Sequence, residues 1–434
     1  MTVTTSYTVP ALQLRVPPLL SISATGLFLG LGCILYAVMS QPTPDSPGLT
    51  EVAIAACLAI SALSAGAHHA LNPMSLARRR PPWLLAGTVY LVYALSIPLV
   101  IGMMYGNGLK PIARDLAGLV FWALPVIYAC LFTHPGQARM FKNIVIWALV
   151  VIGLCFSMRF LTALYTVTGT LTLAPSDPDI LLELVNVPSV LFAALFLFGN
   201  GLVLVANDTL RHKVSGLLCL ALASLPVLAG ICALQRANMG ALMAMSFLLL
   251  VLQVTGRPVR SLWSVGVISA LVLIFAPSIQ DILFLMIEKT RLVGFNMRFE
   301  EAEAIFIHME RYKTALVTGM GWGASFISPA AGFTEINFTH NFFMTHWLKL
   351  GLAGLALGTV YVFLLLKPVI RSALMTFKAG PDGTAREHDM VLALSVLFPV
   401  LINLFLYANH KSFDFGLLLL LAAILSPWGR IKSR

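Results

Sequence analysis

Charged residues are scarce in this chain. Asp, Glu, Lys and Arg make up 11% of its 434 residues, whereas 59% are hydrophobic and the mean hydropathy is +0.89. Soluble globular domains carry about 25% charged residues, so the composition excludes that class. It indicates a protein that uses lipid as its solvent.

Other features are also missing. There is no CxxC pair among the six cysteines, Cys33, Cys57, Cys130, Cys155, Cys219 and Cys232. Their irregular spacing within apolar runs excludes a disulfide framework, and we interpret them as small buried hydrophobes. No glycine-rich turn carries the Lys-Ser/Thr of a nucleotide loop. The first apolar run lacks a basic segment directly before it and a small-residue cleavage site, so we expect no cleaved signal peptide.

Long apolar runs recur along the whole sequence. About twenty apolar residues in a helix cross the ~30 Å hydrocarbon core of a bilayer. The sequence therefore predicts an all-α integral membrane protein, a single polytopic domain over residues 1–434, with about twelve transmembrane helices. The start of the sixth is blurred by Pro188, and the seventh and eighth could be one broken unit. The predicted spans are 19–39, 52–71, 83–104, 113–132, 142–162, 186–206, 214–234, 237–253, 261–280, 342–366, 389–408 and 413–428.

The basic residues set the expected orientation. With a cytoplasmic N-terminus, seventeen of the 28 Lys and Arg fall in inside segments, against only four of the 18 acidic residues. This excess predicts that both termini are cytoplasmic and that residues 281–341 lie on the outer, periplasmic face. The net charge of +10 is spread over short loops. That pattern matches topology and anionic headgroups, so we expect membrane lipids and no nucleic acid as partners.

The segment 281–341, inserted between the ninth and tenth spans, is too long for an idle connection in a compact bundle. Its acids Glu300, Glu301 and Glu303 fit a solvated helix face. The apolar residues that predict an amphipathic helix here are Phe299, Ala302, Ile305, Phe306, Met309, Tyr312 and Leu316.

A second outer segment, roughly 163–185, carries Asp177-Pro178-Asp179. The spacing imitates the Asp-x-Asp pair that holds a divalent metal in some glycosyltransferases. Because an Asp-Pro dipeptide favours a plain turn, we predict no metal site there.

His340 and Asn341 stand where this polar segment meets an apolar run. Imidazole is the side chain best suited to exchange protons at neutral pH, and it can take the proton of a sugar hydroxyl. A lone histidine at a helix end is also a common cap. Upstream, Gly319, Gly321 and Gly323 allow close backbone approach to a phosphate or sugar, and a tight turn explains them equally well.

Four arginines lie at the predicted outer face: Arg159 ends the fifth span, Arg236 joins the seventh and eighth, and Arg291 and Arg298 open the long segment. A charge at membrane depth is costly unless it has a partner, so this set implies an anion. The planar guanidinium suits a diphosphate because it gives forked, charge-assisted hydrogen bonds. Snorkelling to lipid headgroups is the simpler alternative for each arginine alone.

The layout over about residues 230–360 resembles the O-antigen ligase and O-antigen/exopolysaccharide polymerase superfamily. The shared features are the His340-Asn341 pair, the Gly351-Leu352-Ala353-Gly354 run that follows, the glycine turn and the arginines. Arg236 resembles the family's Ser-Arg-Gly element, from which Gln235 and Ala237 depart.

The resemblance implies transfer of a glycan from undecaprenyl diphosphate to an acceptor glycan hydroxyl, at the bacterial inner membrane. His340 would activate the acceptor, the arginines would hold the diphosphate, and Asn341 and the glycines would support them. No metal or other cofactor is implied, because arginines can stabilise the leaving charge. A flippase and a chain-length regulator are the partners that accompany a polymerase.

We predict a polymerase, because a genome may carry several polymerases but usually one ligase. The alternative is an O-antigen ligase, which differs in using lipid A–core as acceptor. A secondary transporter or glycan flippase fits less well, because the middles of the predicted spans are nearly free of charge and the two halves show no repeat.

Overall fold

The helices coincide with the apolar runs. The computed structural model describes residues 24–42, 48–65, 81–133, 135–169, 179–270, 298–312, 314–378 and 384–426, with the single positions 273, 284 and 287. Its α-helices are α1 (Ala24–Met39), α2 (Leu49–Ser64), α4 (Pro82–Met104), α5 (Leu109–Ile127), α6 (Pro135–Thr168), α7 (Asp179–Val185), α8 (Pro188–Val205), α9 (Leu210–Cys232), α10 (Arg236–Gly256), α12 (Arg298–Glu310), α13 (Ala315–Thr318), α14 (Phe342–Lys378), α15 (Thr384–Phe405) and α16 (Phe413–Leu425).

The described residues contain seven helices long and apolar enough to cross a membrane, namely α4, α6, α8, α9, α10, α14 and α15. The helices α1, α2 and α16 are apolar but shorter. The chain is therefore an all-α, multi-pass membrane protein. Twelve spans and their orientation stay predictions.

Two uncertain boundaries of the sequence are resolved. Pro188 is the first residue of α8, where its missing N–H leaves no helical hydrogen bond unmade. The predicted seventh and eighth spans are separate helices, α9 and α10. Leu234 between them takes a φ of 52°, and Gln235 is extended.

The centre of the bundle is formed by α8 and α16. Their side chains are buried on nearly all sides, α8 against α6, α9 and α15, and α16 against α5, α6 and α14. A buried acid joins the two central helices: Asp414 of α16 accepts the backbone N–H of Ser189 (2.9 Å) and the hydroxyl of Tyr36 (3.3 Å). A carboxylate at a helix N-terminus is stabilised by the exposed N–H groups and the dipole there.

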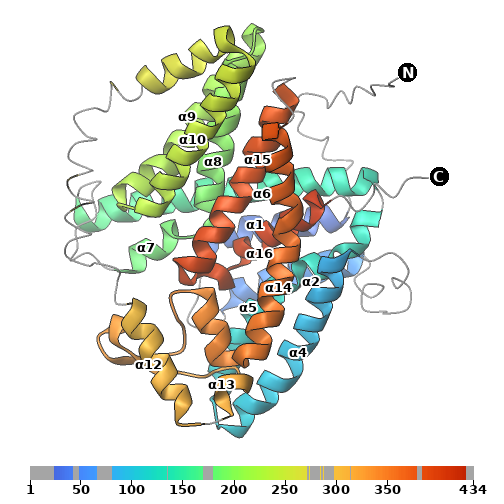
Figure 1. Ribbon diagram of the computed structural model, residues 1–434, viewed down its shortest axis with the longest axis vertical. Coiled ribbons are helices and arrows are strands. Elements are labelled where there is room, and N and C mark those ends of the chain that lie inside the picture. The colour runs from blue at the N-terminus through green and yellow to red at the C-terminus, as the bar shows by residue number, and fades with distance from the viewer. Residues whose placement is uncertain are drawn as a thin grey trace.

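Residues 298–341 form a small unit at one end of the bundle. Figure 1 shows α12 and α13 together at the end opposite to the tips of α9 and α10. The unit also contains a two-stranded antiparallel sheet, β1 (Phe326–Ser328) with β2 (Thr334–Ile336), joined by the 3-10 helix η3 (Pro329–Ala331). Its apolar core includes Ile305, Met309 and Phe326.

The predicted amphipathic helix over residues 299–316 is only partly present: α12 ends at Glu310, Leu316 belongs to the separate α13, and the buried face of α12 differs from the expected one. Ile305 and Met309 are buried as predicted, whereas Phe299 is 76% exposed and Glu301 is 1% exposed. The expectation of a solvated Glu301 was wrong. The face that a helix buries depends on the partners it meets, and Glu301 meets the hydroxyl of Ser328 (3.3 Å) and the His340 segment.

The glycine turn docks on α4 and α14. Helix α14 breaks at Gly351 (φ 68°, ψ −174°), so carbonyls of the preceding turn accept outside donors: Met320 N donates to Leu348 O (2.7 Å) and Gly321 N to Lys349 O (3.0 Å). In α4, Pro98 cannot donate to Ala94 O, and the indole N–H of Trp322 donates there instead (2.7 Å).

This docking requires glycine at position 321. We expect Gly321→Ala to destabilise the protein more than Gly332→Ala. Both glycines have a positive φ, which costs about 1–2 kcal/mol for alanine. Only at Gly321 would a Cβ meet backbone, 2.1 Å from the Gly102 nitrogen, adding about 1–3 kcal/mol or more. Thermal unfolding midpoints of the two purified variants in detergent measure the difference; equal midpoints would contradict the packing described here.

Candidate functional site

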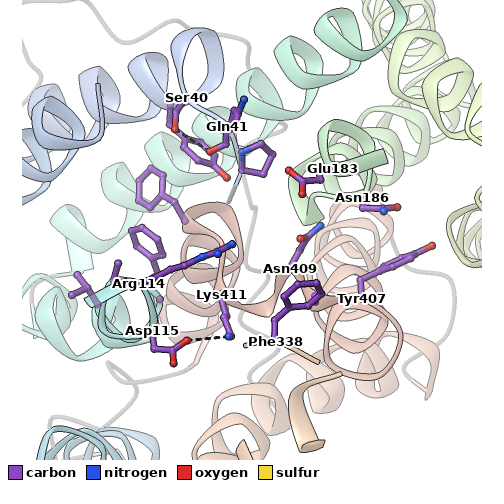
Figure 2. A pocket seen from close by; sticks show the side chains of 18 of the residues that line it. Ser40, Gln41, Arg114, Asp115, Glu183, Asn186, Phe338, Tyr407, Asn409 and Lys411 are labelled. Atoms are coloured by element: carbon purple, nitrogen blue, oxygen red, sulfur yellow. Dashed lines mark hydrogen bonds and ion pairs between the residues drawn. The ribbon is translucent and has the colours of Figure 1, made fainter. Parts of the chain in front are cut away.

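A cavity of about 2010 Å³ opens between the small unit and the bundle. It is bordered by α1, α2, α5, α7, the start of α10, α12, the segment before α14, and η4 (Ala408–Lys411). Figure 2 shows polar side chains from several of these elements converging on it. Its charged residues and its histidine are Glu51, Lys110, Arg114, Asp115, Glu183, Arg236, Arg298, His340 and Lys411. Three residues predicted from sequence, Arg236, Arg298 and His340, thus line one cavity.

His340 is held by Glu301. The Nδ1 atom of His340 lies 3.0 and 3.1 Å from the two carboxylate oxygens of Glu301, and the backbone N–H of His340 donates to the same carboxylate (3.3 Å). Because a carboxylate can only accept, Nδ1 carries a proton, and in the neutral ring the lone pair is therefore on Nε2. The His340 side chain is 32% exposed. A buried acid therefore orients a partly exposed imidazole in the tautomer that a general base needs.

Arg298 and Arg236 come to the cavity from different helices. Arg298 begins α12, and its Nη2 donates to Leu406 O (2.7 Å). Arg236 begins α10, whose start is tied to the α7–α8 junction by hydrogen bonds from Gln235 to Asn186 and from Asn238 to Gln235.

Burial and charge link the two arginines through Tyr407. Burial raises the pKa of the Tyr407 phenol, while the charges of Arg298 and Arg236 act against that rise. Burial lowers the pKa of Arg298, with Tyr407 and Glu301 opposing the change and Arg236 adding to it. The buried Nε of Arg298 has no hydrogen-bond partner in the described part of the chain.

The other two predicted arginines lie elsewhere. Arg159 is not among the residues that border the cavity: its Nη1 donates to Ala37 O (3.0 Å) and Ser40 O (2.7 Å) at the C-terminus of α1. A cation that donates to the last carbonyls of a helix stabilises it, so this placement favours a structural role. Arg291 lies outside the described residues, as do Asp177 and Pro178.

The supporting residues have structural partners. Asn341 caps α14, because its Oδ1 accepts the backbone N–H of Met344 (2.8 Å). Gly319, Gly321 and Gly323 pack against α14, α4 and α5 and do not border the cavity. Their placement favours the turn interpretation over direct contact with a substrate.

A buried ionic cluster was missed in the sequence. Lys349 of α14 is fully buried, and its Nζ lies 2.6 and 2.5 Å from the carboxylate oxygens of Asp115 in α5. The same Nζ donates to Asn337 O (2.6 Å), while Asp115 also accepts Gly323 N (2.8 Å) and Lys411 Nζ (3.3 Å). Both charges lie toward the starts of the predicted spans 113–132 and 342–366, so the prediction that the middles of the spans are nearly free of charge is not tested by them. Two opposite charges inside apolar runs were the available signal, since each needs a buried partner.

His346, six residues after His340, has a packing role. Its ring is buried, with Nε2 2.8 Å from the Tyr90 hydroxyl and Nδ1 3.1 Å from Phe342 O. It stacks among Tyr90, Phe342 and Trp122 and does not border the cavity.

Comparison with known proteins leaves this geometry as the main guide. The chain matches no model of a protein family, and no curated protein matches it. The proposals below therefore depend on the residues themselves and on the resemblance in their layout.

The Asp115–Lys349 pair generates a stability prediction. Lys349→Met takes the closer cation from the buried Asp115 carboxylate and leaves it only the longer contact to Lys411 Nζ (3.3 Å), so the cost should approach the about 3–5 kcal/mol of breaking a buried pair. The double variant Asp115→Asn/Lys349→Met should lose less, because the amide oxygen can still accept Gly323 N and no buried carboxylate is left short of a cation. The Lys411 side chain, which also loses the Asp115 charge in this variant, is 22% exposed and can be solvated. Thermal unfolding in detergent measures both, with the exposed Lys367→Met of α14 as control. A double variant less stable than Lys349→Met would show that the charge pair is not what holds these segments.

Proposed function

We propose that this protein is a glycosyltransferase that acts at the periplasmic face of the bacterial inner membrane and polymerises glycan repeats carried on undecaprenyl diphosphate. The observation that carries the proposal is the cavity in which Arg236, Arg298 and the Glu301-bound His340 meet. A proton acceptor beside a pair of guanidinium groups suits a reaction with a hydroxyl nucleophile and a diphosphate leaving group. The O-antigen ligase reaction is the alternative, since it uses the same donor chemistry.

The proposed step is a single displacement at the anomeric carbon of the donor sugar. The acceptor hydroxyl oxygen attacks that carbon while the bond from the carbon to the diphosphate oxygen breaks. The hydroxyl proton passes to Nε2 of His340, and the lipid diphosphate leaves as an anion. Glu301 stabilises the imidazolium that forms, because its carboxylate stays on Nδ1.

Arg236 and Arg298 receive the charge of the leaving diphosphate. A guanidinium stays protonated and presents several donors in one plane, so two of them can meet both phosphates. Arg298 and Arg236 both border the cavity, which supports a diphosphate site beside their side chains. In such a site the arginines take the role that a divalent cation has in metal-dependent transferases.

A reconstituted assay tests the function. Purified protein in lipid nanodiscs is given lipid-linked repeats with excess EDTA and no nucleotide, and the products are resolved as a ladder. We expect ladders from repeats alone, because a repeat serves as both donor and acceptor for a polymerase. Product that forms only when lipid A–core is added would identify a ligase instead. Activity that requires added magnesium or manganese would contradict the arginine-based mechanism.

His340 and Glu301 should differ in the size of their effect in this assay. His340→Ala removes the base and should lower the rate about 10²–10⁴-fold. Glu301→Gln keeps one acceptor for Nδ1–H but removes the charge that stabilises the imidazolium, so it should lower the turnover rate less and leave the substrate KM nearly unchanged. His308→Ala, in the same helix as Glu301 but not bordering the cavity, is the matched control. Near-normal ladders from folded His340→Ala would remove it from the mechanism.

A further inference from the structure

The cavity holds a second group of cations apart from Arg236 and Arg298. Lys110 and Arg114 of α5 and Lys411 of η4 border it from the side of Asp115. Figure 2 shows the Arg114 side chain extending toward the middle of the view and the amine of Lys411 directed at Asp115, while Tyr407, which interacts electrostatically with Arg236 and Arg298, lies on the other side with Glu183 and Asn186. The cavity therefore has two separate cationic walls.

The buried cluster leaves this second wall positive. Asp115 is the acid closest to Lys411, but its carboxylate is already paired with the fully buried Lys349 at 2.5 and 2.6 Å, nearer than Lys411 at 3.3 Å. One acid between two lysines leaves an excess of one positive charge. Lys110 and Arg114 of α5 border the cavity on the same side.

Helix α5 then changes character along the same face. Lys110 and Arg114 are four residues apart, so they lie on one side of the helix, and the cavity-bordering positions further along α5 are apolar. The apolar positions are Ala117, Val120, Phe121, Leu124 and Ile127, and α2 faces them across the cavity with Val52, Ala55, Ala59 and Ala62. A cationic end followed by an apolar channel fits an amphiphile with an anionic head and a hydrocarbon tail.

The volume supports two occupants. Pockets for a single small ligand measure about 300–1,000 Å³, whereas this cavity measures about 2010 Å³. Two lipid-linked substrates must be present together when one glycan is transferred to another.

We infer that Lys110, Arg114 and Lys411 form a second anion-binding subsite, which takes the diphosphate of the acceptor lipid while Arg236 and Arg298 hold that of the donor. The assignment of donor and acceptor rests on the proposed function. The subsite itself is a binding property, which can be measured without turnover.

Binding stoichiometry is the test. Undecaprenyl diphosphate is titrated onto the full-length protein in detergent, and bound lipid is counted by native mass spectrometry. We expect saturation at two molecules per protein in the wild type and one in Arg114→Gln/Lys411→Gln. Lys110→Gln/Arg114→Gln, which leaves the Asp115–Lys411 contact intact, should also hold one. The control Lys367→Gln/Arg371→Gln removes two charges from α14 away from the cavity and should keep two.

Three results would overturn the subsite. The first is saturation of the wild type at one molecule, and the second is retention of two lipid molecules by both Arg114→Gln/Lys411→Gln and Lys110→Gln/Arg114→Gln. The third is displacement of the second molecule by phosphatidylglycerol or inorganic diphosphate at equal concentration. The last result would mean a general phosphate or headgroup site. Two bound lipids without any ladder in the transfer assay would refute the proposed function and keep the subsite. Ladders formed by a protein that binds only one lipid would refute the subsite and keep the proposed function.

Discussion

The buried pair of Asp115 and Lys349 is the interaction on which the end of the bundle next to the cavity depends. It joins α5 to α14 where both side chains are buried, and their other hydrogen-bond partners hold neighbouring segments: Asn337 O and Gly323 N fix the segment before His340 and the glycine turn, and Lys411 fixes η4. Taking two charges out of water is expensive unless they meet each other with further hydrogen bonds. This cluster fulfils that condition, and it sets where α5, the segment before His340 and η4 lie at the cavity.

The side chains that border the cavity are held in fixed positions by their neighbours. His340 is fixed by its backbone and its ring to one carboxylate, and Asn341 caps the helix that follows, so the imidazole cannot rotate freely. The arginines that face it come from the starts of α10 and α12, where backbone hydrogen bonds and tertiary contacts hold them. Preorganised groups of this kind stabilise charge without the cost of reorientation during a reaction.

The sequence predicted the helices well because hydrophobicity is a local property of the chain. It also singled out three residues that border the cavity: Arg236 stands between two apolar runs, while Arg298 and His340 lie in the long polar segment and at its end. It did not predict partners that are far apart in sequence: Asp115 and Lys349 are separated by 234 positions. Glu301 was misjudged for the same reason, because apolar periodicity reports what α12 could bury, and only the neighbouring Ser328 and His340 determine what it does bury. Arg159 shows the converse, since its isolation in sequence suggested a ligand and its contacts are the last carbonyls of α1.

The burial of α16 has a consequence for biosynthesis. This helix fills the space among α5, α6, α8, α14 and α15, and the ribosome makes it after all of them. Until it is translated, the N-terminus of α8 lacks the Asp414 carboxylate, and η4 with Lys411 is not anchored beside α5. The earlier helices therefore stand in the bilayer around an incomplete centre until α16 has been made, and the segments that border the cavity take their places only after that.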